Sequence, residues 1–231
     1  MTTTISHDVP TIGAGPINKK ETKHLFKRRS AVSIGVLFIV QVLTAAIGLS
    51  LVESFLGGQA NRTMLTTGVV LMMFSGILIA AIGVLLYPIL KLANKTLAAW
   101  VVTIRATEAA VAMAFGIYLL QNLQVVPNHL MWVYILAGAA GVIFTSLLLA
   151  ANLVPRPIAA LGLLGYSLLL LGVALDLPGI VDMHSGTAQA LIIPGALFEV
   201  IVLPIWLFAK GFKRPEISAR TTGQSTPALH A

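Results

Sequence analysis

Six long apolar runs constrain the fold of this chain more than any other feature. Each run holds about 20 residues, and a helix rising ~1.5 Å per residue then covers a hydrocarbon core of ~30 Å. Helices are the expected form, because lipid offers no partner to an unpaired backbone amide. The runs cover residues 31–52, 67–90, 97–120, 129–151, 157–177 and 188–209. The sequence therefore predicts an all-α polytopic bundle of six transmembrane helices over residues 31–212, between polar tails at 1–30 and 213–231.

The composition agrees with a membrane protein. The chain is 57% hydrophobic and 10% charged, whereas about a quarter of the residues of a soluble domain are charged. It has no cysteine, which excludes a disulfide, a thiolate metal site and a cysteine nucleophile. The first apolar run and the polar segment before it are both longer than in a signal peptide, so an uncleaved helix is expected.

Basic residues predict the orientation. Thirteen of the 15 lie on one side of the predicted membrane: Lys19, Lys20, Lys23, Lys27, Arg28, Arg29, Lys91, Lys95, Arg156, Lys210, Lys213, Arg214 and Arg220. Only Arg62 lies on the other side. The positive-inside rule then places both termini in the cytoplasm of a multi-pass protein of the cell membrane. The basic N-terminal tail is expected either to contact anionic lipids or to be a disordered leader that serves only the topology. Without a basic folded face no nucleic-acid partner is expected.

Three charged residues lie inside the predicted spans: Arg105 and Glu108 in the third, and Glu199 in the sixth. A charge at such depth costs at least ~2.5 kcal/mol and normally finds a partner in the bundle interior. Glu108 lies ~16 Å and Glu199 ~15 Å from the same membrane surface, counted along their helices. We therefore expect Arg105 to face inward and to contact Glu199, as well as or instead of Glu108. With two acids and one base, one glutamate should hold a proton for part of the time.

Small residues also mark the third span. Ala112 and Gly116 lie near the face that carries Arg105 and Glu108, and a second row is formed by Ala106, Ala110 and Ala114. Small residues let helix backbones approach closely. The pattern predicts a central position for this helix in the bundle.

The buried cluster of Arg105, Glu108 and Glu199, called the Arg/Glu cluster below, has two interpretations of nearly equal weight. It locks the helices in register, or it forms a proton relay or polar binding site. The structural role is slightly favoured, because Gln41 and Ser75 are only weak additional signals of a polar path.

Three prolines are candidate helix breaks: Pro88, Pro194 and Pro204. A proline inside a helix frees a carbonyl and permits a kink, and interrupted helices often build the substrate sites of transporters. For Pro88 the general frequency of proline in membrane helices is the favoured explanation.

No set of residues for a cofactor, a metal ion or catalysis is found. His129, Asp182 and His184 lack the spacing of metal ligands. No span contains a histidine pair for haem, a lysine for retinal, or the aspartate pair, Ser/His arrangement or zinc motif of an intramembrane protease. The sequence favours a protein that is not an enzyme and has neither cofactor nor metal.

Three segments carry a recognisable pattern: "LYPILKLANKTLAAWVVTIRATEA", "LVPRPIAALGLLG" and "LFEVIVLPIWLFAKGF". The residues of this pattern are Tyr87–Pro88, Arg105, Glu108, Val154–Pro155–Arg156, Phe198–Glu199, Trp206–Leu207 and Lys210–Gly211–Phe212. Together they resemble a bacterial membrane family known as domain of unknown function 4386. The resemblance implies a six-helix integral membrane protein, and the family offers no established substrate.

Two functions fit these observations. The sequence narrowly favours a non-catalytic protein that assembles with, or regulates, a membrane partner or another copy of itself, because six helices with short loops leave little room for a pathway. The alternative is a small transporter or proton-coupled sensor in which Glu108 and Glu199 titrate.

Overall fold

The computed structural model describes residues 28–126, 128–181, 183 and 190–213 of the chain. The predicted polar tails, with most of the basic residues assigned to them, therefore lie almost wholly outside the described residues. Asp182 and His184 lie outside them as well.

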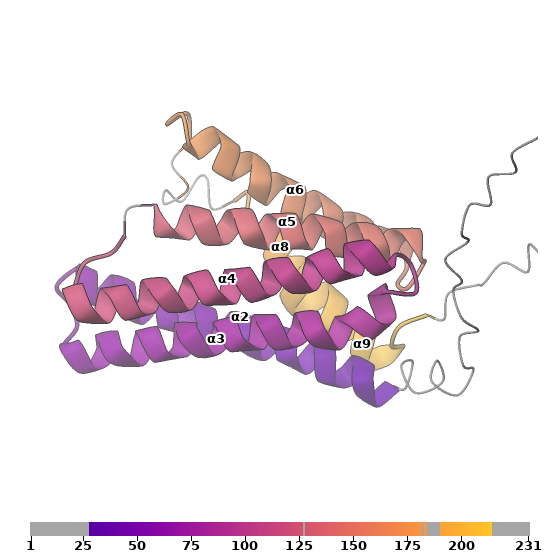
Figure 1. The fold of residues 1–231 in the computed structure, drawn as a ribbon, viewed down its shortest axis with the longest axis horizontal. Coiled ribbons are helices and arrows are strands. Elements are labelled where there is room, and N and C mark those ends of the chain that lie inside the picture. The colour runs from indigo at the N-terminus through magenta and orange to yellow at the C-terminus, as the bar shows by residue number, and fades with distance from the viewer. Residues whose placement is uncertain (1–27, 127, 182, 184–189, 214–231) are drawn as a thin grey trace, which may run out of the picture.

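The described residues form helices and no strand, which confirms the all-α fold (Figure 1). Five helices are long and apolar enough to cross a membrane. They are α2 (Arg28–Leu56), α3 (Arg62–Leu90), α4 (Lys95–Asn122), α5 (His129–Ala150) and α6 (Arg156–Asp176). Asparagine caps fix two of the starts, because the side chains of Asn61 and Asn94 accept hydrogen bonds from the Met64 and Leu97 amides.

The sixth predicted span is shorter than expected and irregular. Helical residues run from Ile193 to Ala209, in the order α8 (Ile193–Leu197), a π-helical turn η1 (Phe198–Val202) and α9 (Leu203–Ala209). At ~1.5 Å per residue this segment is ~25 Å long, below the ~30 Å of a hydrocarbon core.

The prolines account for part of this irregularity. Pro204 has no N–H, and its ring would clash with the carbonyl four residues earlier in a regular α-helix. The wider turn before it is closed by the Leu203 amide, which donates to the Phe198 carbonyl. Pro194 lies in the first turn of α8, where a missing N–H costs nothing. Pro88 lies inside α3, which continues to Leu90.

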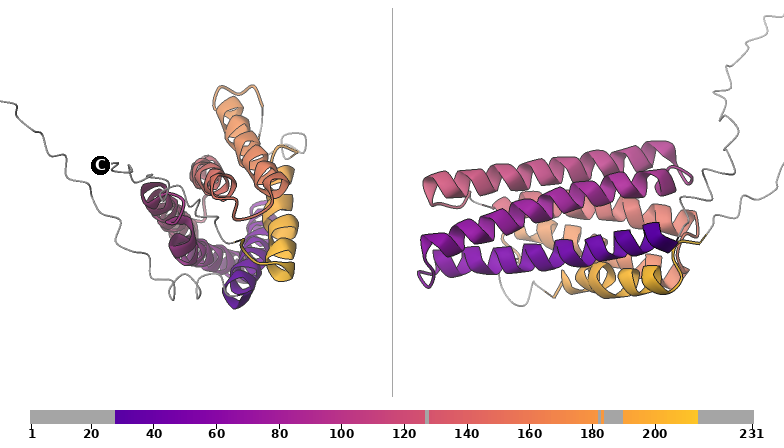
Figure 2. Two further views of the ribbon diagram at one scale, coloured as in Figure 1. Left: turned by 90° about the vertical axis from the view of Figure 1, so that its right-hand side faces the viewer. Right: turned by 90° about the horizontal axis from the view of Figure 1, so that it is seen from below.

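The helices form a ring. Going round it, α2 packs on α3, α3 on α4, α4 on α5 and α5 on α6, and the segment from α8 to α9 closes the ring between α6 and α2. Figure 2, left, looks along the bundle and shows these elements in turn. The predicted central position of α4 is therefore wrong: this helix is one member of the ring, and its row of Ala106, Ala110 and Ala114 is exposed.

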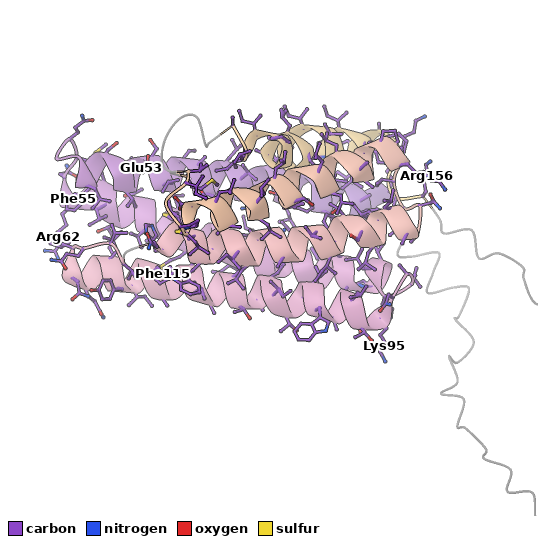
Figure 3. All side chains as sticks on the ribbon, turned by 90° about the horizontal axis from the view of Figure 1, so that it is seen from above. Glu53, Phe55, Arg62, Lys95, Phe115 and Arg156 are labelled. Atoms are coloured by element: carbon purple, nitrogen blue, oxygen red, sulfur yellow. The ribbon has the colours of Figure 1, made fainter. Side chains whose placement is uncertain are left out.

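The two ends of the bundle differ. We call the end where α2 begins and α9 ends the terminal end, and the opposite one the far end (Figure 2, right). Figure 3 shows Lys95 and Arg156 at the terminal end, and Glu53 and Arg62 at the far end. The half near the terminal end is a packed apolar core that includes Leu86, Leu90, Leu148, Leu203 and Leu207. The assignment of the terminal end to the cytoplasm stays a prediction.

Hydrogen bonds to main-chain carbonyl groups also hold the terminal end together. Arg28 Nη2 donates to the Phe208 carbonyl oxygen at 3.1 Å, and the Lys213 amide donates to the Leu153 carbonyl oxygen at 2.7 Å. The first helix, the last helix and the connection between α5 and α6 are thus joined at this end.

Candidate functional site

Arg105 lies at the centre of a buried ion-pair cluster. Its stem passes over Gly83 on α3, where an added Cβ would lie 3.2 Å from the Arg105 Cβ. Arg105 Nη1 donates to Glu108 Oε2 at 2.9 Å, and Arg105 Nη2 lies 3.5 Å from Glu199 Oε1. The predicted contact with Glu199, in addition to Glu108, is therefore present. It joins the third and sixth helical segments.

Tyr166 on α6 is a fourth member that the sequence analysis missed. Its hydroxyl donates to Glu199 Oε1, the same oxygen that faces Arg105. The ring occupies the space left by the missing side chain of Gly141 on α5, and lies edge-on to Phe198 with centroids 6.2 Å apart. The one available signal was a tyrosine hydroxyl in the middle of an apolar run, at a depth close to that of Glu199.

Glu199 is the most accessible carboxylate of the cluster. Its side chain is 17% exposed, against 3% for that of Glu108. Among the described residues, Glu199 Oε2 has no hydrogen-bond partner, since Tyr166 and Arg105 both approach Oε1. A solute that reaches the cluster would therefore meet Glu199 first.

A cavity of about 280 Å³ lies inside the ring and reaches this cluster. Its polar end is formed by Arg105, Glu108, Tyr166 and Glu199, with Gln41 and Ser75 beside them. Gln41 Nε2 donates to Ser75 Oγ at 3.3 Å, so these two buried groups satisfy each other.

The remaining walls of the cavity are mainly apolar and lie in the half near the far end. The residues on them include Val52, Val69, Met72, Ala112, Phe115, Gly116, Leu119, Val126, His129, Val133, Tyr134 and Leu169. Figure 3 shows Phe115 in this half, toward the α5 side of α4. The small residues Ala112 and Gly116 thus provide room for the cavity.

Four aromatic side chains pack in a row in the apolar core beside the Arg/Glu cluster. Ring centroids are 6.2 Å apart for Phe38 and Phe144, 6.4 Å for Phe144 and Phe198, and 6.2 Å for Phe198 and Tyr166. We call these four residues, which come from α2, α5, η1 and α6, the aromatic floor. Of the four, Tyr166 lines the cavity, and from the Arg/Glu cluster the cavity extends into the half near the far end.

No group of three or more His, Asp or Glu side chains in the described part of the chain could hold a metal ion. His129 lies on the cavity wall, edge-on to Phe115 at 6.0 Å. Its Nδ1 is 3.1 Å from the Val126 carbonyl oxygen, a contact within the loop before α5.

Comparisons with known proteins found a family model that matches part of the chain. Residues 117–211 match the model of a family described as a domain of unknown function, DUF4386. The match includes Phe198–Glu199, whereas Arg105 and Glu108 lie before it. Comparison with curated proteins found no match, and neither did comparison with solved structures. This match supports the resemblance seen in the sequence over residues 117–211, where the chain is similar to that family.

Proposed function

We propose that the protein is a small proton-coupled transporter that takes a small molecule into the central cavity from the far end and exchanges it for a proton on Glu199. The observation that carries the proposal is the position of Glu199, a partly exposed carboxylate at the polar end of the central cavity. We place the far end outside the cytoplasm, following the distribution of basic residues.

Two reasons for preferring a purely structural role no longer hold. The helices were expected to leave little room, but the ring encloses about 280 Å³, close to the lower limit of ordinary ligand pockets. Gln41 and Ser75 were only weak signals of a polar path in the sequence, and in the structure both line the cavity together with Tyr166. These observations favour transport over assembly with a membrane partner.

The charge of the cluster supplies the proton coupling. Arg105 neutralises one carboxylate, and a second ionised carboxylate in an apolar interior costs several kcal/mol unless it is neutralised. A proton on Glu199 is the simplest neutralising group when the cavity holds no cation. Because Glu199 is the exposed member, protons can reach it through the cavity.

Transport also needs the aromatic floor to open toward the terminal end. Phe198 belongs to this floor and to the π-helical turn that precedes Pro204. Single π-turns within helices are frequent at functional sites, and interrupted helices next to a polar midplane site are typical of transporters. The turn Phe198–Val202 is therefore the element that we expect to move.

Cysteine labelling tests the direction of the cavity, since the natural chain has no cysteine. Ala112→Cys lies on the cavity wall, and Ala98→Cys is the matched control on the same helix, fully buried near the terminal end. In intact cells a membrane-impermeant maleimide should label the Ala112→Cys variant and leave the Ala98→Cys variant unlabelled. Equal protection of both positions would exclude a cavity open to the far end.

Infrared spectroscopy tests the proton. A pH-difference spectrum of the purified protein in nanodiscs should show a C=O stretching band of a buried protonated carboxyl group, and Glu199→Gln should remove it. If the band is present in Glu199→Gln and absent from Glu108→Gln, Glu199 does not carry the proton and the proposed role passes to Glu108.

A further inference from the structure

We infer that the ligand of the cavity is a small apolar molecule with a single positive charge, such as a protonated amine, whose charged group binds at Glu199. The inference rests on the proposed function and adds the chemical class of the substrate. It follows from the charge of the cluster, the contacts already made by Arg105, and the nature of the cavity walls.

The charged groups of the cluster do not balance. With all groups ionised, Arg105 contributes one positive charge, and Glu108 and Glu199 contribute two negative charges. The groups that face Glu199 come from α4 (Arg105 and Glu108) and from α6 (Tyr166). Two of the elements packed against η1, α8 and α9, contain no titratable residue. A third, α2, has its titratable residues in the described chain near the ends of the helix. One positive charge is thus missing at Glu199.

An anionic ligand fits the site poorly. Arg105 is the one basic side chain among the described residues at the polar end, and its two terminal nitrogens already face Glu108 and Glu199. An anion would have to displace one of these carboxylates and leave it buried without a partner, which is costly. A divalent metal ion is also disfavoured, because the described residues contain no cluster of three ligand side chains.

The cavity walls fit the rest of such a ligand. Apolar side chains from α2 to α6 line most of the space, and the aromatic residues Phe115, Tyr134 and Tyr166 are among the lining residues. Aromatic faces attract cations, especially away from water. A small amine with an aromatic or aliphatic body would therefore place its body among these walls and its ammonium group at Glu199 Oε2.

Binding and proton release then form one balanced exchange. Before binding, Glu199 carries a proton and the cluster is neutral. The protonated amine enters from the far end, its N–H group donates to the Glu199 carboxylate, and the Glu199 proton leaves through the cavity to the aqueous phase. No bond other than the O–H bond of Glu199 is broken, and the net charge of the site does not change.

Three probes of similar size test the charge of the ligand: 2-phenylethylammonium, neutral 2-phenylethanol and anionic phenylacetate. The protein is the full chain with Ala112→Cys in nanodiscs, and the readouts are protection of the introduced thiol from maleimide and proton release into a weakly buffered solution. The cation should protect at a concentration at least about tenfold lower than the alcohol does, given an opposite charge at contact distance in a site of low polarity. It should also release about one proton per molecule bound, as the exchange of one charge for another requires.

Matched glutamine variants assign the effect to Glu199. Glu199→Gln should lose the preference for the cation and the proton release, while protection by the alcohol persists and shows that the cavity is intact. Glu53→Gln removes the same charge from an exposed position at the far end and should keep both. A cation preference that survives Glu199→Gln would overturn the inference, and so would stronger protection by phenylacetate.

The outcomes also separate this inference from the proposed function. If the alcohol and the cation protect the thiol of Ala112→Cys equally, the ligand class is wrong but a ligand-binding cavity remains. If this thiol is labelled and none of the probes protects it, the inference is again wrong. If it cannot be labelled at all, the proposed function itself fails.

Discussion

Arg105 Nη2 lies 3.5 Å from Glu199 Oε1, and this ion pair joins α4 to the π-helical turn across the inside of the ring, where the two elements are not neighbours. The contact fixes the position of the irregular segment from α8 to α9 along the axis of α4, a long regular helix. A cation that binds Glu199 would compete for the same carboxylate. Ligand binding would then loosen the connection between α4 and the turn that we expect to move.

The first prediction concerns Arg105→Ala. Removal of the guanidinium leaves Glu108 and Glu199 buried without a basic partner, and breaking a buried pair in this way costs about 3–5 kcal/mol. The unfolding free energy in mixed detergent micelles should fall by this order. Arg62→Ala, an exposed arginine at the far end, should change it by less than about 0.5 kcal/mol.

A second substitution shows whether the unpaired acids cause this loss. Adding Glu108→Gln to Arg105→Ala removes the carboxylate that is ionised while Glu199 holds the proton, so the double variant should be more stable than Arg105→Ala alone. An equal or larger loss in the double variant would mean that the packing of the arginine stem over Gly83, and not its charge, is what matters.

The second prediction concerns Glu108→Gln. Arg105 and Glu199 then form a neutral pair, and no positive charge is missing from the site. The preference for 2-phenylethylammonium over 2-phenylethanol should fall to near unity even though Glu199 is unchanged, as measured by thiol protection in the Ala112→Cys background. A preference retained in Glu108→Gln would show that the cation recognises Glu199 locally and not the net charge of the cluster.

The third prediction compares two changes around Tyr166. Gly141→Ala places a Cβ where the Tyr166 ring lies, and overpacking of this kind costs about 1–3 kcal/mol. Tyr166→Phe keeps the ring against Gly141 and removes only the hydroxyl that donates to Glu199. It should cost about 0.5–1.5 kcal/mol.

The carboxyl band in the infrared spectrum tests the hydrogen bond from Tyr166 to Glu199. Both variants should shift the C=O band assigned to Glu199, because both take the hydroxyl away from Oε1. A band that is unchanged in Tyr166→Phe would show that this hydrogen bond does not form in the membrane.

The long helices could be predicted from the sequence because their signal is local. An apolar run of about 20 residues needs no knowledge of its neighbours, and each of the first five runs lies within, or nearly within, a helix of the structure. Some helices are longer than their apolar runs because they begin at polar caps such as Asn61 and Asn94, which precede the apolar residues. The sixth run was predicted too long and too regular, since its π-helical turn depends on Pro204 and on how the last segment packs against α2 and α6.

The site was predictable only where it carries charge. Arg105, Glu108 and Glu199 stood out because a charge in an apolar run is costly, and their similar depth followed from counting residues. Tyr166 carries no charge, and its role depends on Gly141 in another helix. The cavity depends on the order of helices around the ring, which no periodicity in the sequence encodes.

The last prediction concerns Pro204→Ala and the π-helical turn. Alanine restores an N–H that can donate to the Val200 carbonyl and removes the ring that clashes with it, so the segment can relax into a regular α-helix. The π-helical turn holds one residue more than an α-helical turn. Without this extra residue, Phe198 and Glu199 turn by ~100° relative to α9, and Glu199 moves away from Tyr166 and Arg105. Thermal stability should stay the same or rise, since alanine is the better helix former, while the infrared band of Glu199 shifts and the preference for the cation falls.

Pro88→Ala is the matched control, because Pro88 lies near the end of α3 with no π-helical turn beside it, and it should leave both readouts unchanged. If Pro204→Ala also leaves them unchanged, the turn is held by the contacts of Glu199 and not by the proline.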